Sequence, residues 1–231
     1  MNKKILKITI LAAFTMLIGN SSAQFTYFAR GGMNFSSMVV IDPDGVSEKG
    51  LTNLAGFQIG GGVDYALNDN MGIELSALYA QRGSNYNSTS TDGTLGIESI
   101  LTSKISLNYI DIPLNFRYST EVGPGKLNIL VGPKFGIGLS GNWKGDVKSS
   151  FMGQTNSVAI DEKMTFGSND TNQFKTLDMG IGFGLGYEIE KFHFQATYTY
   201  GLTNHVNNPE KSEKVTQNMI AITVGYRFND N

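Results

Sequence analysis

Apolar and polar residues alternate along eight separate stretches of the chain. Alternation with a period of two places apolar side chains on one face of a β-strand and polar side chains on the other. The clearest stretch runs from Thr176 to Glu190, where bulky apolar residues alternate with polar residues and glycines. The pattern predicts eight strands, at residues 25–36, 55–67, 71–82, 104–118, 126–142, 176–190, 192–202 and 219–228.

The connections between these stretches alternate in length. Short links are expected at 68–70, 119–125 and 190–191, and long polar ones at 37–54, 83–103, 141–175 and 203–215. After residue 23 no run approaches the ~18 apolar residues of a spanning helix, whereas a closed barrel can cross lipid with every backbone group paired. The sequence therefore predicts an all-β fold, a closed eight-stranded antiparallel up-and-down transmembrane β-barrel. Its short turns and both termini would be periplasmic, and its long loops extracellular.

The stretch at 104–118 changes phase. Ile105, Leu107 and Tyr109 share one parity, whereas apolar residues from Ile110 to Tyr118 share the other. One extra residue must then intervene, and Pro113 cannot donate a ladder hydrogen bond. We expect a β-bulge between Tyr109 and Pro113, with Asp111 inside this motif; the alternative is that Pro113 prevents a strand here.

Aromatic residues gather where the expected strands would meet the two membrane interfaces, as in other barrels of this kind. One girdle would comprise Tyr27, Tyr65, Tyr118, Tyr187, Phe192, Tyr226 and Phe228. The other would comprise Phe35, Phe57, Tyr79, Tyr109 and Tyr200, with Trp143 just above.

Residues 1–23 have the features of a secretory signal peptide. A lysine-rich start is followed by an apolar run from Ile8 to Ile18 and by the small residues Ser21, Ser22 and Ala23. Such a segment is removed after export, so residues 24–231 would form the barrel domain. Its loss removes three lysines and makes the net charge more negative than the −2 of the whole chain. Because no basic cluster remains, nucleic acid is not an expected partner.

The chain contains no cysteine, so it can form neither a disulfide nor a thiolate metal site. Its two histidines, His193 and His205, lack the spacing of metal ligands. We expect His193 to form hydrogen bonds in the lumen and His205 to lie in a loop. No cofactor or metal is expected.

Ionisable residues occur at inward positions of several expected strands. The interior of an eight-stranded barrel is just wide enough for side chains, and buried charges must pair to be tolerated. We expect a structural, salt-bridged lumen cluster of Arg30, Asp64, Glu74, Arg117, Glu188, His193 and Arg227.

Hairpin geometry places particular members of this cluster opposite one another. A tight turn at 68–70 sets Asp64 opposite Glu74, and a two-residue turn at 190–191 sets Glu188 opposite His193. Two facing carboxylates could form the acid and base of a hydrolase. We favour the structural interpretation and expect no enzyme.

The strand at 104–118 also carries a family resemblance. Residues Tyr109 to Tyr118 read YIDIPLNFRY, which resembles the Y-[LI]-[DE]-I-P-L strand of the PorT-like outer-membrane β-barrel family of Bacteroidota. Gly132-Pro133, Asp178 with Gly186 to Glu188, and the ending Gly225 to Phe228 are also similar. The resemblance implies an integral outer-membrane barrel, and the family's name comes from a member linked to secretion. Many outer-membrane proteins end on the aromatic residue, whereas here Phe228 is followed by three more residues.

Function is expected in the loops. The loop at 141–175 contains Trp143, Phe151, Met152, Met164, Phe166 and Phe174. These residues could form a lid over the barrel or present a binding face, and the sequence leaves both open.

The first hypothesis is a binding, adhesion or structural role in the outer membrane, with outer-membrane lipid and a protein at the loops as partners. The second is an accessory subunit of a secretion or uptake assembly. The third is a small barrel enzyme acting on lipid.

Overall fold

The computed structural model describes residues 25–92, 97–152, 154–167, 174–207 and 209–229. The expected signal peptide at 1–23 lies outside this part of the chain and stays a prediction. In the described part no helix is long and apolar enough to cross a membrane.

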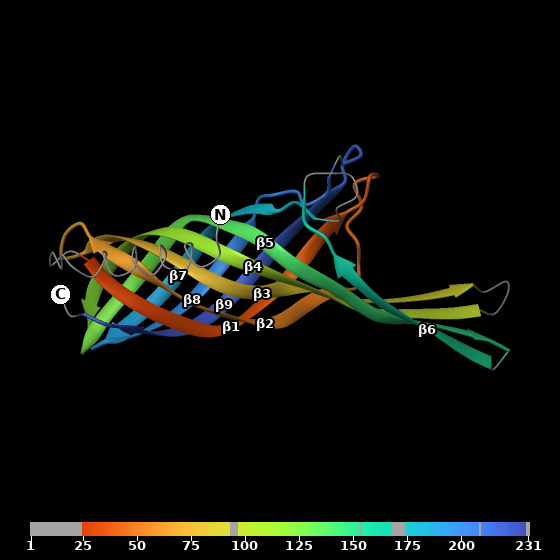
Figure 1. Cartoon of the computed structure of the whole chain (residues 1–231), viewed down its shortest axis with the longest axis horizontal. Coiled ribbons are helices and arrows are strands. Elements are labelled where there is room, and N and C mark those ends of the chain that lie inside the picture. Colours follow the sequence, from red (N-terminus) through yellow and green to blue (C-terminus); the bar gives the residue numbers. More distant parts are fainter. Residues whose placement is uncertain (1–24, 93–96, 153, 168–173, 208, 230–231) are drawn as a thin grey trace, which may run out of the picture.

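Nine strands form a single antiparallel sheet (Figure 1). They are β1 (Phe25–Ile41), β2 (Leu51–Ala66), β3 (Met71–Asp92), β4 (Ile97–Val122), β5 (Gly125–Phe151), β6 (Gln154–Met164), β7 (Leu177–Ile189), β8 (Phe192–Gly201) and β9 (Lys214–Arg227). Eight of them, all except β6, close into a ring because β1 pairs with β9 and β4 pairs with β5. The prediction of a closed eight-stranded antiparallel barrel is confirmed.

Short and long connections separate the two ends of the barrel. The turn end carries the links at 67–70, 123–124 and 190–191, together with the start of β1 and the end of β9. The opposite end, called the loop end below, carries the long connections.

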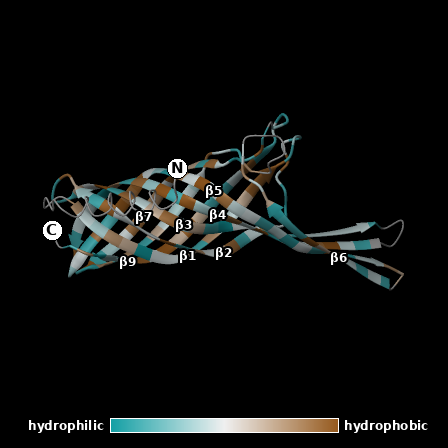
Figure 2. Cartoon of the chain, in the orientation of Figure 1, coloured by the Kyte–Doolittle hydropathy of each residue, from teal (hydrophilic) through white to brown (hydrophobic). Residues whose placement is uncertain are grey.

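The two faces of the barrel wall have opposite polarity. Apolar side chains that point outward are well exposed, including Ile59 at 60% and Leu185 at 58%. Polar and charged side chains that point inward are buried, including Asn34 and Asp64. Apolar and polar positions consequently form bands across the strands in Figure 2. Because the outer face is apolar, the barrel suits a lipid environment.

Two segments that the sequence predicted as loops are largely strands. β3 continues to Asp92, β4 starts at Ile97, and β5 runs on to Phe151 before β6 returns along it. Serine, threonine and asparagine dominate the β3–β4 part, so it lacks apolar alternation, but β3 and β4 keep one register from Met71 with Tyr118 to Asp92 with Ile97. The four strands extend beyond the ring at the loop end (Figure 1). We call residues 86–92, 97–105, 143–151 and 154–162 the projecting sheet.

The expected bulge between Tyr109 and Pro113 is wrong. β4 keeps one register with β3 throughout, and its odd-numbered residues face inward from Ser103 to Ser119. The register shift lies between β4 and β5, where Asn108 pairs with Ser140 and Tyr109 with Gly138, so the extra residue is Leu139 of β5. Tyr109 is therefore fully buried inside the barrel and does not belong to an outer aromatic girdle.

Candidate functional site

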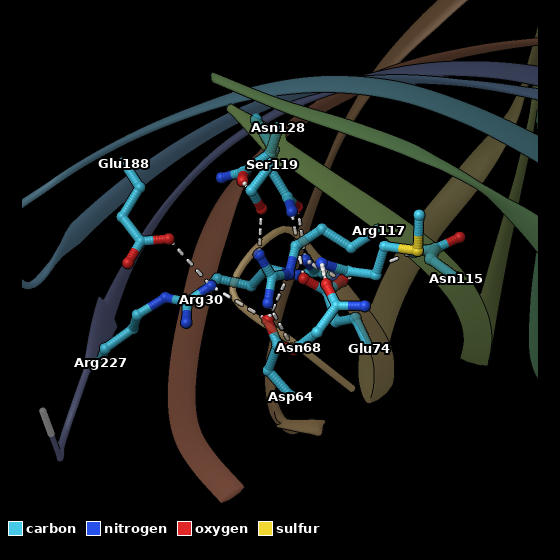
Figure 3. A network of polar contacts seen from close by, with 12 residues as sticks. Arg30, Asp64, Asn68, Glu74, Asn115, Arg117, Ser119, Asn128, Glu188 and Arg227 are labelled. Atoms are coloured by element: carbon cyan, nitrogen blue, oxygen red, sulfur yellow. Dashed lines mark hydrogen bonds and ion pairs between the residues drawn. The ribbon is translucent and has the colours of Figure 1, made fainter. Parts of the chain in front are cut away.

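Six charged side chains meet inside the barrel near its turn end, and we call them the turn-side cluster (Figure 3). They are Arg30, Asp64, Glu74, Arg117, Glu188 and Arg227. Strands β1, β2, β3, β4, β7 and β9 each supply one of them. They can meet because inward positions face a lumen only one or two side chains wide. Three guanidinium groups balance three carboxylates.

The ion pairs of this cluster link six strands. Arg30 Nη1 lies 2.8 Å from Glu74 Oε1, and Arg117 Nε lies 2.8 Å from Asp64 Oδ2. Arg227 Nη2 connects the two sides, at 3.1 Å from Asp64 Oδ2 and 3.0 Å from Glu188 Oε2. Charge-assisted pairs of this length are the strong class of hydrogen bond.

Neutral polar groups complete the partners of these charges. Gln195 accepts a hydrogen bond from Arg30 and donates one to Glu74 Oε2 at 3.2 Å. Ser119 accepts a hydrogen bond from Arg117 and donates one to Asn128 Oδ1 at 2.6 Å. Every charge of the cluster except Glu188 is thus held by several contacts, as a buried charge requires.

His193 departs from its expected hydrogen-bonding role. The register does set it opposite Glu188, but neither imidazole nitrogen has a hydrogen-bond partner in the described structure. Its ring instead packs edge-on against Phe28, with centroids 5.2 Å apart. Phe28, an exception to the outward alternation of β1, points into the lumen.

A second charged group, the loop-side cluster, lies farther along the lumen. It consists of Arg82, Asp111, Lys134 and Asp178. Arg82 Nη2 is 3.1 Å from Asp111 Oδ1 and its Nη1 is 2.8 Å from Asp178 Oδ2, whereas Lys134 Nζ is 3.5 Å from Asp111 Oδ2. Two cations again balance two carboxylates, so each cluster is neutral in itself.

His205 contacts the loop-side cluster from above. Although it follows β8 in a segment without strand structure, as expected, its side chain is buried and its Nε2 lies 3.3 Å from Asp178 Oδ1. The ring also packs against Phe174, with centroids 5.8 Å apart. The β8–β9 loop therefore folds into the mouth of the barrel.

Apolar side chains close the lumen at the loop end. We call Met38, Leu107, Tyr109 and Phe174 the apolar plug, against which Phe166 and Met164 also pack. The Tyr109 ring touches both zones: Arg82 Cζ lies 3.7 Å from its centroid, and Phe166 meets it edge-on at 5.4 Å. Together with the clusters, the plug fills the interior.

The space left between the two clusters is small. A cavity of about 40 Å³ is lined by residues of both, including Arg30, Asp111 and Lys134. This volume holds a few water molecules at most. No group of side chains suited to hold a metal ion occurs among the described residues.

Six of the seven lumen residues predicted from the sequence form the turn-side cluster, and the exception is His193. The loop-side cluster was not predicted. Arg82, Lys134 and Asp178 occupy inward positions on alternating strands, so strand parity was the signal that could have found them. Asp111 was noted only as part of the strand motif. The assumed bulge reversed the faces of Ile105, Leu107 and Tyr109, whereas the inward position of Asp111 already followed from the parity of Ile110 to Tyr118.

The projecting sheet has one apolar and one polar face. On one face Leu101, Val147 and Val158 form a cross-strand row, because the ladder pairs Leu101 with Val147 and Val147 with Val158. On the other face Lys104, Lys144 and Asp161 are aligned in the same way. Unlike the barrel wall, this sheet has no second layer against it in the described structure.

The two interpretations of the 141–175 segment apply to different parts of it. Phe166 and Phe174 fold over the mouth as a lid. Phe151 and Met152, in contrast, form the tip of the β5–β6 hairpin, where Met152 is 85% exposed. Residues 168–173 lie outside the described part.

A family model and several solved structures resemble this chain. The model described as "Outer membrane protein beta-barrel domain" matches residues 20–207. No curated protein matches the chain.

The similar solved structures are outer-membrane proteins of low sequence identity. The Ail attachment invasion locus protein of Yersinia pestis is 16% identical over 88% of this chain and 99% of its own, with a TM-score of 0.37. Neisserial surface protein A is 13% identical over 87% and 97%, with a TM-score of 0.43. The N-terminal β-barrel domain of Pseudomonas aeruginosa OprF is 17% identical over 86% and 97%, with a TM-score of 0.29.

Proposed function

Because this chain belongs to the outer membrane protein beta-barrel domain family, we propose that it is a sealed, non-enzymatic barrel whose projecting sheet attaches to proteins outside the cell. The single observation that carries the proposal is the contrast between a filled lumen and an ordered, exposed sheet beyond it. Export by residues 1–23 and an orientation with periplasmic turns belong to the same proposal, and the short turns at one end support it.

The lumen supports a structural role for the turn-side cluster. Removing charges from water is costly, so a narrow interior tolerates them only in well-made pairs. Asp64 and Glu74, the candidate acid and base, are each buried and bound by a guanidinium group. The apolar plug blocks the loop end, and at the turn end Asp64 and Glu74 are only 2% and 1% exposed, which argues against the lipid-enzyme hypothesis.

The projecting sheet supports attachment. The exposed apolar residues Val158 and Phe151 lie on strands beyond the barrel, and Met152 lies in the turn between those strands. Exposed apolar groups on an extramembrane element favour protein contacts. A rigid sheet also loses less conformational entropy on binding than a mobile loop.

A second candidate is a subunit of a secretion or uptake assembly of the PorT-like kind. The strand motif from Tyr109 to Tyr118 favours it. Such a subunit would bind its partners through the barrel or its periplasmic turns and would not need the projecting sheet.

Trimming the sheet tests the main proposal. In the trimmed variant, residues 88–101 and 146–159 are each replaced by an Asn-Gly turn, which joins Asn87 to Thr102 and Gly145 to Ile160 at positions already paired. Cells displaying the full chain should attach to one another and to serum-protein-coated wells more than cells with an empty vector. Cells displaying the trimmed variant should attach like the vector control.

Folding is checked by the altered gel mobility of unboiled samples, which both proteins should show. Equal attachment by the full and trimmed chains would contradict the proposal. A partner that co-purifies equally with both would favour the assembly subunit.

A further inference from the structure

Strand β6 forms an open edge of the projecting sheet. It pairs with β5 along its whole length, from Gln154 with Phe151 to Met164 with Gly141, and with no other strand of the described structure. It contains neither proline nor glycine, and its first seven residues are uncharged. Natural proteins usually protect an exposed edge with charges, proline or bulges, because its free backbone groups pair readily with another strand. Most of β6 lacks this protection.

The row formed by Leu101, Val147 and Val158 ends at β6, and no neighbouring strand in the described part of the chain covers its last side chain. Leu101 and Val147 are partly covered by their neighbours, whereas Val158, the last member of the row, is 64% exposed. Ile160 lies on the same face two residues later. An added strand with apolar residues at matching positions would continue this face and cover Val158.

A second copy of β6 is itself such a strand. It fits when it pairs antiparallel with the first copy and the two Ala159 residues lie opposite one another. Val158 of one copy then lies opposite Ile160 of the other, and the symmetry repeats the pair. On the opposite face Ser157 meets Asp161 in the same way. The remaining charged residues would meet Thr155 and Asn156, so no two like charges face one another.

Membrane geometry decides where the second copy can be. β6 runs from the hairpin tip toward the barrel, and all copies in one membrane have this direction. Antiparallel pairing needs the reverse direction, so it requires a copy whose barrel lies in a facing membrane. Eleven strand residues span about 35 Å, and the sheet projects beyond the barrel (Figure 1).

From this edge we infer that β6 pairs with β6 of a second copy in a facing outer membrane, which joins two cells through one continuous sheet. The inference rests on the proposed attachment function and names its partner. One such contact is small, so attachment depends on many copies acting together. The other open edge, β3 from residue 88 onward, is rich in serine and threonine and lacks apolar residues at equivalent positions.

Charge exchange at the edge tests both the partner and the register. The full chain is reconstituted in uncharged phosphatidylcholine vesicles, and clustering is followed by light scattering. Wild-type vesicles should cluster. V158K/I160K vesicles and V158E/I160E vesicles should each remain dispersed, because residue 158 lies opposite residue 160 and like charges then meet. Mixing the two should restore clustering, which high salt should weaken.

A matched control places the same charges on the other edge. The T89K/T91K variant changes two exposed residues of β3 and should cluster like the wild type. Every variant should keep the gel mobility of a folded barrel, since the changed side chains lie on the projecting sheet, outside the barrel.

Three results would overturn the inference. Dispersed wild-type vesicles, with attachment to coated wells still lost on trimming, would reject the second copy as partner but keep the proposed function. If wild-type vesicles do not cluster with one another but attach to cells that lack the protein, the partner is a foreign strand or surface. Clustering of each charged variant alone, or a mixture that stays dispersed, would show that β6 does not pair in this register.

Discussion

Arg82 illustrates how single residues stabilise the interior of this barrel. Its guanidinium group is completely enclosed, contacts Asp111 and Asp178, and stacks over Tyr109. The planar group can direct donors at two carboxylates while its face rests on an aromatic ring. Removing it would leave two buried carboxylates with only Lys134 and His205 beside them.

The Arg82→Leu variant should lose about 3–5 kcal/mol of unfolding free energy, the usual effect of breaking a buried ion pair. The measurement is the urea dependence of the folded fraction in detergent, read from unboiled gels. Lys144→Leu is the matched control, since Lys144 pairs with Asp161 at 3.3 Å on the exposed sheet and surface pairs contribute about 1 kcal/mol or less.

Adding Asp178→Asn to Arg82→Leu should recover part of the loss, because Lys134 and Asp111 then remain as a neutral pair. Equal losses for Arg82→Leu and Lys144→Leu would show that the loop-side cluster contributes no more than a surface pair.

At the level of elements, the central part of β4 and the segments around Phe166 and Phe174 together form the apolar plug and the lid that covers it. Leu107 and Tyr109 point inward because apolar side chains from the loops cover them. Gly138 on β5 leaves room for this arrangement, since a Cβ there would lie 2.3 Å from the Phe166 ring. The lid therefore packs as part of the barrel core.

Cysteine labelling tests this packing, and the cysteine-free chain gives no background. Leu107→Cys should react slowly with a membrane-impermeant maleimide, since Leu107 is 1% exposed. Adding Phe166→Ala and Phe174→Ala should speed the reaction by about tenfold or more, because large cavities destabilise the closed lid. Thr155→Cys, on exposed β6, should react rapidly in both backgrounds. If Leu107→Cys alone reacts as fast as Thr155→Cys, the plug does not close the lumen.

The whole molecule combines a closed ring with an open sheet. Eight strands share every barrel edge with a neighbour, whereas β6 and the outer part of β3 each pair on one side within the described residues. The ring satisfies the backbone in lipid, where an open edge is not tolerated. Within the described residues, segments of β1, β3, β6 and β9 at the loop end pair on one side only, and water can solvate them there.

We expect no steady conductance when the wild-type chain is inserted in a planar bilayer. Two neutral ion-pair clusters and the apolar plug occupy the lumen, and its cavity of about 40 Å³ offers no continuous path. Insertion is verified by protease protection of the barrel strands. Stepwise currents with reproducible amplitude would contradict the sealed lumen.

Much of the fold could be predicted from alternation. Residues such as Ile59 and Asp64 reveal their faces through local parity, and the spacing of turns reveals eight strands. The projecting strands could not be predicted in this way, since residues 87–92 are polar on both faces and are held by ladder hydrogen bonds to β4. A polar strand and a polar loop are alike in hydropathy.

Local parity was also sufficient to place Arg30, Glu74 and Arg227 toward the lumen, because each follows from its own strand. The partners of these charges depend on which strands become neighbours when the ring closes, as the contact of Arg227 with Asp64 across β1 shows. The inward turn of Leu107 and Tyr109 depends likewise on loops that return from distant parts of the chain. Alternation in the sequence determines only whether a side chain points inward or outward. Closure of the barrel determines which other side chains it meets across the lumen.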